Sequence, residues 1–506
     1  MRLRVLLLAL AGLVHGAAQS APLFENQTGN IRHIYTGGWE HFVGGGVAAF
    51  DCDGDRLADL YIAGGSGPAV LLRNQSQLSG LVFKAATPAS LALTSVIGAY
   101  PLDIDSDGIL DLAVLRVGEN RLLKGDGACG FTPFTGLGFR STDRWTTAFS
   151  ATWEAANTLP SLAFGNYVDR QAPNGPFQAC DTGFLYRPKA NTYSAPTPLA
   201  PAYCPLSMLF SDWGRRGRAD LRVSNDRHYY VKDGAEQLWS MQQPARLYTR
   251  ADGWQKYMIW GMGIASRDIS GDGLPEVFLT SMGDQKMQSL VLAQTGPHYR
   301  DATYERGTTA HRPYIGDDGR PSTGWHAAFG DIENNGLDDI FIAKGNVEQM
   351  PTSAMADPNN LLLQQPDGRF VEAGDRAGIA STDRSRGAAL VDLNLDGLLD
   401  LVVVNRNANL EIYRNISSGT GHWLEVALRQ QGANSFAVGA WIEVDTGARI
   451  MAREITVGGG HAGGTAGYEH FGLGAVSRLK LRVIWPDGTI GDWADLAADQ
   501  ALTIHR

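Results

Sequence analysis

The chain has 506 residues, of which 44% are hydrophobic, and its formal net charge is −10. This acidity disfavours nucleic acid and anionic membrane surfaces as partners, because both repel a negatively charged protein. The four cysteines form no Cys-x-x-Cys motif, which argues against redox catalysis and a structural zinc site.

The N-terminus is typical of a secretory signal peptide. Arg2 and Arg4 precede an apolar run over residues 5–14, and small residues follow it, so we expect a signal peptide over residues 1–20 with cleavage near Ser20. The apolar run is too short for a membrane anchor, and no later segment is apolar for long enough to span a bilayer. We therefore expect an exported protein, either secreted or periplasmic.

Five nine-residue acidic loops, each followed at once by an apolar strand, dominate the chain. Oxygen-bearing side chains at loop positions 1, 3, 5 and 9 suit a hard cation that takes many oxygen ligands, which means Ca²⁺ before Mg²⁺. Without a metal, so many close carboxylates would repel one another. The sequence therefore predicts up to five Ca²⁺ sites. The candidate ligands are Asp51, Asp53, Asp55 and Asp59; Asp103, Asp105, Asp107 and Asp111; Asp268, Ser270, Asp272 and Glu276; Asp331, Glu333, Asn335 and Asp339; and Asp392, Asn394, Asp396 and Asp400.

The five loops differ in charge. At the candidate ligand positions, the loops that begin at Asp51 and Asp103 carry four carboxylates each and the other three carry three, so the first two should bind Ca²⁺ most tightly. An EF-hand does not fit these loops, because no bidentate Glu stands at position 12 and no helix pattern flanks them.

The spacing of the loops indicates a repeat of about 60 residues, with one gap about three times longer. We place two degenerate copies in that gap. One has its loop over residues 212–220, and a weaker one lies at 162–167 with its following loop replaced by an insertion over residues 169–205. Seven units of this length are typical of propeller blades.

The degenerate loop at residues 212–220 has Arg216 at position 5, which cannot ligate Ca²⁺. We hypothesise that its guanidinium lies between Asp212 and Asp220 as an internal cation in place of a metal. The alternative is that Arg216 and the neighbouring arginines are simply solvated.

The insertion over residues 169–205 is rich in proline and tyrosine and holds two of the four cysteines. Cysteines of an exported protein are expected to pair. We favour Cys180–Cys204, which leaves Cys52–Cys129 as the second pair. A disulfide-closed aromatic loop on a rigid scaffold fits a binding element, and the alternative is a cover over the edge of a blade.

Each repeat has the same layout, which predicts an all-β fold. A strand of small residues precedes the acidic loop and an apolar strand follows it, then a polar turn and another strand. Glycine and alanine before the loop fit an inner strand close to a crowded central axis. Tryptophans shortly before the loops are expected in the blade core rather than on a sugar-stacking platform: Trp39, Trp260 and Trp325.

The C-terminal tail carries motifs that identify a second domain. They are the segments 437–444, 453–455, 458–460, 470–474 and 483–488. These segments resemble the ASPIC/UnbV domain, and the acidic loop with its strand resembles the FG-GAP/VCBS-type repeat. A propeller followed by that domain is the layout of the cartilage acidic protein family. The resemblance implies a seven-bladed integrin-like β-propeller over residues 21–415 and a smaller β-rich domain over residues 416–506.

Three further sequence features have structural and functional interpretations. The glycine-rich run at residues 458–464 is expected to be a conformationally demanding β-loop rather than a phosphate site, since no Lys-Ser/Thr follows it. His461 and His470 are expected to be structural. Asn-x-Ser/Thr sequons occur at Asn26, Asn74 and Asn415, but that pattern is common by chance.

The sequence thus favours a non-catalytic, exported, calcium-binding propeller that presents loops to an extracellular or periplasmic protein or glycan, as cell-adhesion modules do. The metal would be structural, so that its binding free energy stabilises the fold. The sequence predicts no catalytic residue and no organic cofactor site. The alternative is a carbohydrate-active hydrolase or lyase with its site at the propeller mouth, for which His41, His326 and Asp284 are candidates.

Overall fold

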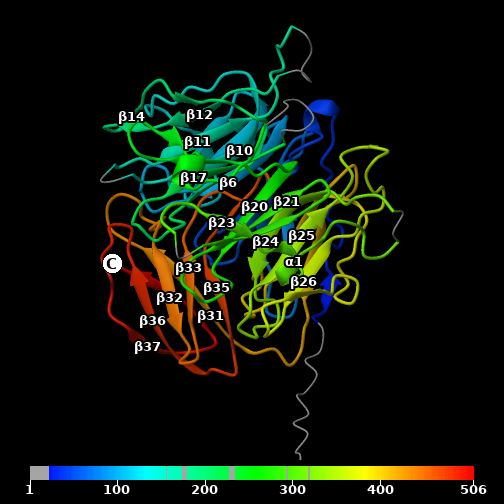
Figure 1. Ribbon diagram of the computed structural model, residues 1–506, viewed down its shortest axis with the longest axis vertical. Helices are drawn as coiled ribbons and strands as arrows, with labels where there is room; N and C mark the ends of the chain where they lie inside the picture. Colours follow the sequence, from blue (N-terminus) through cyan, green and yellow to red (C-terminus); the bar gives the residue numbers. More distant parts are fainter. Residues whose placement is uncertain (1–21, 155–156, 174–178, 227–233, 292–293, 317–318) are drawn as a thin grey trace, which may run out of the picture.

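A computed structural model describes residues 22–154, 157–173, 179–226, 234–291, 294–316 and 319–506. These residues form strands and loops almost throughout (Figure 1), so the predicted all-β fold is confirmed. Their helical elements are α1 (Thr303–Arg306) and the 3-10 turns η1 (Trp39–His41) and η3 (Arg250–Asp252). None of the described helices is long and apolar enough to cross a membrane. The predicted signal peptide lies outside the described residues.

Apart from one two-stranded hairpin, the described strands before residue 416 fall into antiparallel sets of four, of which the second and third are joined into one sheet by pairing between β7 and β10. The first set is β2 (Val47–Phe50), β3 (Asp59–Ile62), β4 (Val70–Asn74) and β5 (Phe83–Ala85); the second is β6 (Val96–Leu102), β7 (Asp111–Gly118), β8 (Arg121–Gly125) and β9 (Phe131–Pro133); the third is β10 (Arg144–Thr152), β11 (Ser161–Asn166), β12 (Gly183–Tyr186) and β15 (Thr197–Leu199); the fourth is β16 (Pro205–Ser211), β17 (Asp220–Asn225), β18 (Gln237–Ser240) and β19 (Arg246–Leu247).

The remaining sets follow the same order along the chain. The fifth is β20 (Gly261–Arg267), β21 (Glu276–Ser281), β22 (Lys286–Leu290) and β23 (Tyr299–Asp301); the sixth is β24 (Gly324–Gly330), β25 (Asp339–Lys344), β26 (Asn360–Gln364) and β27 (Phe370–Glu372); the last is β28 (Arg384–Val391), β29 (Asp400–Arg406), β30 (Glu411–Asn415) and β1 (Phe24–Asn26).

The first strand of each set lies next to the first strand of the following set. Contacts run from β2 through β6, β10, β16, β20 and β24 to β28, and β28 contacts β2 again. The strands therefore enclose an axis, as in a β-propeller. The N-terminal strand β1 pairs with β30 and so supplies the outermost strand of the last set. This pairing ties the two ends of the ring together.

The third set corrects the prediction for the weak repeat. The prediction placed residues 162–167 on the strand before the loop, with the loop itself replaced by the insertion; they instead fall on and just after β11, the second strand of the set. The segment predicted as an insertion contains β12 and β15, the outer half of this set, and the small hairpin β13 (Pro188–Lys189) and β14 (Thr192–Tyr193). The error arises because β10 and β11 are both apolar. Without the regular acidic residues in the loop between them, the sequence does not show which strand precedes the loop and which follows it.

Both expected disulfides are present. Cys180–Cys204 closes the outer half of the third set, and Cys52–Cys129 joins the first acidic loop to the second set. The backbone N–H of Cys129 also donates to the carbonyl oxygen of Cys52 at 3.1 Å. The prediction that all four cysteines pair is confirmed.

The C-terminal strands form two sheets of their own, at the lower left in Figure 1. One sheet is β35 (Glu469–Gly474), β31 (His422–Arg429) and β38 (Gln500–His505); the other is β33 (Ile450–Glu454), β32 (Trp441–Asp445), β36 (Arg478–Ile484) and β37 (Ala494–Ala497). They share a core that includes Leu424, Ile442 and Phe471. The short strand β34 (Thr465–Ala466) instead pairs in parallel with β2 of the ring.

The glycine-rich segment at residues 458–464 enters the axis of the ring. It hydrogen-bonds to inner strands of different sets through Tyr100, Met208, Ile264 and His326. The nearest approach is to β6, where a Cβ added to Gly98 would lie 1.6 Å from the carbonyl oxygen of Ala462. The C-terminal sheets thus insert a plug, defined as residues 458–464, between the inner strands.

Candidate metal centre

Each acidic loop joins the inner strand of a set to its second strand, and backbone N–H groups hold its first carboxylate. In the first loop, Asp51 accepts hydrogen bonds from the N–H groups of Gly54 (2.7 Å) and Arg56 (2.8 Å). The equivalent side chains bond in the same way: Asp103, Asp268, Asp331 and Asp392. The loop therefore folds around its position-1 carboxylate.

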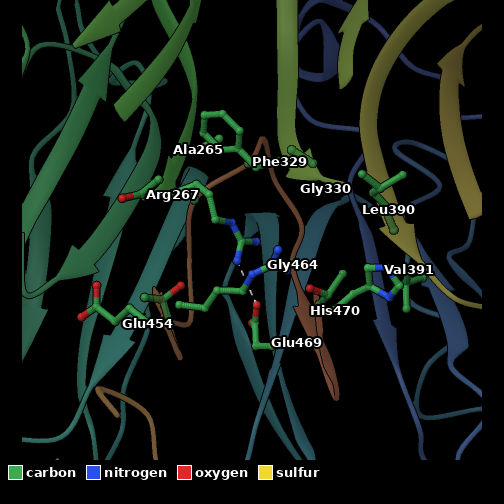
Figure 2. Close-up of a pocket in the computed structure, with 18 of the residues that line it drawn as sticks. Ala265, Arg267, Phe329, Gly330, Leu390, Val391, Glu454, Gly464, Glu469 and His470 are labelled. Atoms are coloured by element: carbon green, nitrogen blue, oxygen red, sulfur yellow. Dashed lines mark hydrogen bonds and ion pairs between the residues drawn. The ribbon is translucent and has the colours of Figure 1, made fainter. Parts of the chain in front are cut away.

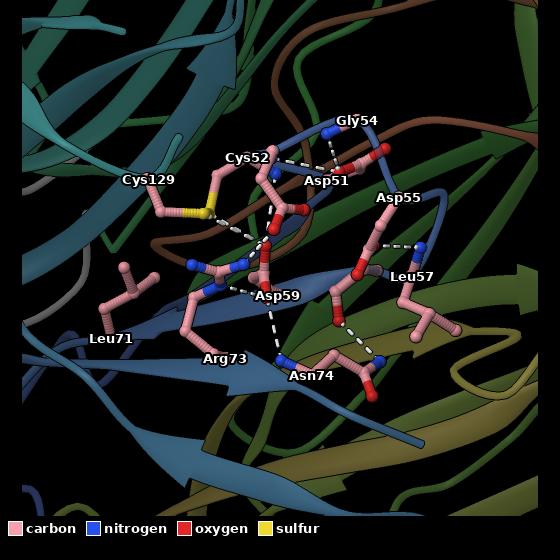
Figure 3. Close-up of polar contacts among 12 residues, drawn as sticks. Asp51, Cys52, Gly54, Asp55, Leu57, Asp59, Leu71, Arg73, Asn74 and Cys129 are labelled. Carbon is pink, nitrogen blue, oxygen red and sulfur yellow. Dashed lines mark hydrogen bonds and ion pairs between the residues drawn. A yellow bond between two sulfur atoms is a disulfide. The ribbon is translucent and has the colours of Figure 1, made fainter. Parts of the chain in front are cut away.

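The position-9 carboxylate begins the second strand and is fixed from two sides. Asp59 accepts the N–H of Cys52 at 3.1 Å and that of Asn74, on β4, at 2.8 Å (Figure 3). The same pair of bonds holds three of the other position-9 side chains: Asp111, Asp339 and Asp400. Because position 9 lies at a strand end, its carboxylate cannot swing away from the loop.

Two loops bring three carboxylates together. Oxygens of Asp51, Asp53 and Asp59 lie within 4.8 Å of one another, and so do those of the second loop's residues at the same positions, Asp103, Asp105 and Asp111. The other loops, with Ser or Asn at position 3 or 5 or Glu at position 3, hold no such trio among the described residues. Position 5 belongs to neither trio; there Asp55 accepts the N–H of Leu57 at 2.9 Å and Asp107 accepts that of Ile109.

Position 3 supplies an oxygen that nothing in the described chain satisfies. Asp53 Oδ1, Asp105 Oδ1 and Asn394 Oδ1 are all buried without a hydrogen-bond partner. A buried acceptor without a partner is costly unless a cation or water meets it. Three separate loops share this feature at the same position, so the residues present fit a cation with oxygen ligands.

Basic side chains on the third strand offset part of the loop charge. Arg73 bonds to Asp53 and lies 3.3 Å from Asp59, and Lys124 bonds to Asp105 and, at 2.7 Å, to Asp107. Even with Arg56 counted in the first loop, the carboxylates outnumber the cations, which leaves a net negative loop that a divalent ion would balance. Cys52 and Cys129 also lie beside Asp59, but their sulfurs form a disulfide and are not thiolate ligands.

Burial makes several of these carboxylates hard to ionise. It raises the pKa of Asp111 to about 8 and that of Asp59 to about 6, and neighbouring carboxylates add to the effect. In the other loops burial likewise raises the pKa of Glu276, Asp331 and Asp392 to about 7. A bound cation would favour the charged form, so the metal-free loops are electrostatically strained.

The degenerate loop is built on the same backbone bonds but holds a guanidinium. Arg216 Nη2 lies 2.7 Å from Asp220, and its Cζ stacks 4.0 Å from the centre of the Trp213 ring. Asp212 instead accepts the backbone N–H of Arg216 at 2.8 Å. The internal cation of our hypothesis is thus paired directly with Asp220, while Asp212 caps the loop as position 1 does elsewhere.

The C-terminal sheets cover the face of the ring that carries the loops. Ser435 donates a hydrogen bond to Asp103, and Arg453 contacts Asp338 at 2.8 Å. Glu454 accepts the backbone N–H of Asp212 at 2.7 Å. Ser435 places a hydroxyl oxygen beside the second loop from 332 residues along the chain. Sequence spacing holds no signal that could have found it.

A polar cavity of about 200 Å³ lies between the two parts on this face. Figure 2 shows Arg267 and Glu469 joined across it, at 3.2 Å, with Glu454 and His470 on either side. Burial raises the pKa of Glu454 to about 8. His470 Nε2 lies 2.7 Å from Asn334 Oδ1 of the fourth loop. This contact gives His470 the structural surroundings that we expected.

The three catalytic candidates of the alternative hypothesis lie in different surroundings. His326 Nδ1 accepts the backbone N–H of His461 at 3.0 Å in the plugged axis, and burial lowers the pKa of His326 to about 4. His41 is buried, and burial lowers its pKa. Asp284 is exposed and lies 2.7 Å from His311.

Comparison with known protein families gives separate matches for the ring and for the C-terminal sheets. The family described as ASPIC and UnbV matches residues 430–506, and the FG-GAP-like repeat matches residues 51–114, which include the first two acidic loops. The chain carries an FG-GAP-like repeat and an ASPIC/UnbV domain. The resemblance inferred from the sequence is therefore confirmed, and the plug and Ser435 belong to the ASPIC/UnbV domain.

The curated relatives are distant. Cartilage acidic protein 1 of Homo sapiens is 27% identical over 161 residues, which cover 31% of this chain and 22% of that protein. Cartilage acidic protein 1 of Mus musculus is 24% identical over 235 residues, which cover 45% of this chain and 34% of that protein. This chain thus spans about a third or less of these relatives.

A solved structure of BBS1N in complex with ARL6DN has 10% identity and a TM-score of 0.47, and the match covers 79% of this chain and 99% of that one.

Proposed function

We propose that this chain is an exported, calcium-binding β-propeller that acts as a non-catalytic adhesion or binding module for a protein or glycan. In this proposal each four-stranded set is one of seven blades over residues 21–415, and residues 416–506 form the ASPIC/UnbV domain. The signal peptide is cleaved near Ser20. The observation that carries the proposal is the buried, unpartnered position-3 oxygen that recurs in three loops.

The proposed ligands are the side chains at positions 1, 3, 5 and 9 of the five acidic loops. Bound Ca²⁺ supplies positive charge and prefers six to eight oxygen ligands. The chain itself does the positioning: backbone N–H groups orient positions 1 and 9, and Arg73 and Lys124 hold one side of position 3. The ion would thus stiffen the hairpin between the inner strand and the second strand of a set, and its role is structural.

The compartment and the class of function rest on separate support. Two disulfides are typical of an oxidising, extracellular or periplasmic environment. The FG-GAP-like repeat and the likeness to cartilage acidic protein 1 suggest an extracellular, adhesion-like propeller. A rigid ring that presents loops is suited to binding rather than to a single chemistry.

Metal removal tests the proposal. Protein dialysed free of divalent ions should bind Ca²⁺ in calorimetry, and millimolar Ca²⁺ should raise the melting temperature; one site at a hundred times its Kd adds about 2.7 kcal/mol. A pull-down from the native host with and without Ca²⁺ then identifies the partner. An identical melting curve in Ca²⁺ and in excess EGTA would overturn the metal part of the proposal.

The alternative, a carbohydrate-active hydrolase or lyase, has one observation in its favour. The Asp284–His311 pair borders a cavity of about 430 Å³ at the end of β21, where the carboxylate could orient the imidazole as a base. Depolymerisation of a polysaccharide by the native protein, lost in Asp284→Asn, would support it. If the protein degrades none of a broad panel of polysaccharides, the enzyme hypothesis is rejected and the binding-module hypothesis is retained.

A further inference from the structure

A cavity of about 520 Å³ lies at the mouth of the ring opposite the acidic loops. Trp145, Met262 and Trp325 line it from the starts of β10, β20 and β24, whereas the loops follow the ends of inner strands. Tyr167 lines it just after β11, which runs back from the loop face. The ASPIC/UnbV domain covers the other face, so this mouth cavity is separate from the metal centre.

The wall of the mouth cavity is aromatic and sulfur-rich. Its lining includes Trp39, Trp145, Trp325, Met262, Met282 and Met350. Trp39 and Trp325, which the sequence placed in the blade core, thus also face a cavity. Methionine side chains adapt to irregular apolar guests and make favourable contacts with aromatic rings. A cavity of this size and composition is typical of a small-molecule site.

The few charged groups of the wall already have partners. Glu348 lies 2.6 Å from Arg406 Nε and 3.3 Å from Arg384, and Asp226 accepts a hydrogen bond from Tyr167 at 2.5 Å. No lysine or arginine is among the described residues that line the cavity. Among the described lining residues an anionic guest would therefore meet carboxylates and no cation, and a sugar would find few donors and acceptors for its hydroxyls.

The floor of the mouth cavity is fixed before any guest arrives. Trp325 is fully buried and donates its indole N–H to the carbonyl of Gly345 at 2.7 Å. The Arg386 guanidinium stacks 4.1 Å from the Trp325 ring centre, and the His461 ring of the plug lies 5.1 Å from it. Gln349 and Pro351 are exposed, so the cavity opens to solvent there. A preformed site lowers the ordering cost of binding.

We propose that the mouth cavity binds a small, neutral, apolar molecule, such as one with a fused aromatic ring system. The site requires neither Ca²⁺ nor a macromolecular partner, so it goes beyond the proposed function. Binding places the guest against Trp39 and Met350 at the rim and above Trp325 at the floor.

Calorimetry with four probes tests the class of guest: 2-methoxynaphthalene, the 2-naphthyltrimethylammonium cation, naphthalene-2-sulfonate and diacetylchitobiose. The neutral naphthalene should bind at least about tenfold more tightly than the other three, a difference of about 1.4 kcal/mol. Tighter binding of any other probe, or no binding of the neutral one, would overturn the proposal. Running each titration with and without Ca²⁺ keeps this outcome independent of the metal sites.

Two variants test the place of binding. Val347→Trp and Met350→Trp each put an indole into the cavity from a half-buried rim position, and both should weaken the neutral probe at least tenfold. Val371→Trp, at the exposed position of β27, is the matched control and should bind as the parent does. A neutral naphthyl diazirine should also label Trp39 or Met350 peptides of the unaltered protein. Unchanged affinity in folded blocking variants, or labelling confined to other peptides, contradicts the assignment.

Discussion

At the residue scale, the backbone of each acidic loop turns twice through the left-handed region. Gly54 and Arg56, at positions 4 and 6 of the first loop, have φ of 82° and 76°, and the same two positions are left-handed in the other four loops. Position 6 is glycine in those four. A non-glycine residue there costs roughly 1–2 kcal/mol. These turns aim the backbone N–H groups at the position-1 carboxylate and so fix it close to the side chains of positions 3 and 9 in the first two loops.

Asp105→Asn tests the position-3 ligand. The amide keeps the shape of the side chain but removes the charge beside the unpartnered oxygen, so we expect the Ca²⁺ Kd of this loop to rise about tenfold, or about 1.4 kcal/mol. Calcium titration by calorimetry measures the change. The control Glu119→Gln neutralises an exposed carboxylate on the same set, paired with Arg121 at 2.8 Å. Equal Ca²⁺ binding by the two variants would show that Asp105 is no ligand.

At the element scale, side chains on the third strands form hydrogen bonds that link neighbouring sets. Asn74 donates to the carbonyl of Leu393 at 2.8 Å, and Asn415 donates to that of Ile332 at 3.0 Å; both acceptors are at position 2 of an acidic loop in another set. Both asparagines are buried. Two of the three sequons are therefore structural and inaccessible to glycosylation in the folded protein, while Asn26 is exposed.

Arg216→Ala tests the loop that holds a guanidinium in place of a metal. Asp220 is buried and Arg216 is its closest cation, so removal should cost about 1–2 kcal/mol even in saturating Ca²⁺; partial exposure of Arg216 keeps the loss below that of a fully buried pair. Denaturant unfolding measures it. Arg218→Ala, whose Nε lies 3.6 Å from Asp220, is the control and should cost less than about 0.5 kcal/mol. Similar stability of the two variants contradicts the hypothesis.

At the scale of the whole molecule, the plug makes the ring and the ASPIC/UnbV domain one packed unit. Gly458, Gly459 and Gly460 all have left-handed φ, and Ala462 has φ of 57°. Glycine adopts this conformation without strain, so the run of left-handed positions explains the glycine-rich segment better than a phosphate site does. The same domain bonds to Asp103 and Asp338 around the acidic loops. Loss of metal should therefore loosen the domain contact as well as the loops.

Gly98→Ala tests the plug. A Cβ at Gly98 would overlap the carbonyl oxygen of Ala462, and β6 is itself packed, so we expect a loss of about 3 kcal/mol or more and faster proteolysis of the tail. Thermal unfolding and limited proteolysis measure these effects. Gly38→Ala is the control, since nothing lies within 4 Å of a Cβ there. A Gly98→Ala protein as stable and as resistant as the control would contradict the insertion of the plug.

The pH dependence of the metal-free protein follows from the buried acids. Burial raises the pKa of Asp111 to about 8 and of Asp59 to about 6, against about 3.9 in the unfolded chain. Between these values the folded state holds more protons than the unfolded chain. For these groups stability is therefore greatest below about pH 4 and falls as the pH rises towards 8. Each group contributes a slope of at most about 1.4 kcal/mol per pH unit.

Calcium should reverse that trend, because its ligands must be deprotonated. We expect the melting temperature of dialysed protein to fall from pH 5 to pH 8, and the increase produced by Ca²⁺ to grow over the same range. Scanning calorimetry at both pH values, with and without Ca²⁺, measures this. A Ca²⁺ effect that shrinks as the pH rises would contradict the role assigned to these carboxylates.

The sequence favoured the disulfide pairing without deciding it. By itself it determined the strand content, the acidic loops and the C-terminal family motif. Each of these features is recognisable from a short stretch of sequence. Loop ligands such as Asp51 and Asp59 lie within nine residues, and a strand can be recognised from five or six residues. The register of the third set was lost because its loop, at residues 153–160, has no regular acids to mark it.

Only the tertiary structure decided what lies beside the loops and at the opposite mouth. Ser435 reaches Asp103, residues 458–464 enter the axis, and Trp39 and Trp325 meet around one cavity, although hundreds of residues separate the partners. Such contacts depend on how the ring closes and how the second domain packs on it. No local pattern encodes them, because the free energy that fixes them comes from burial between elements rather than within them.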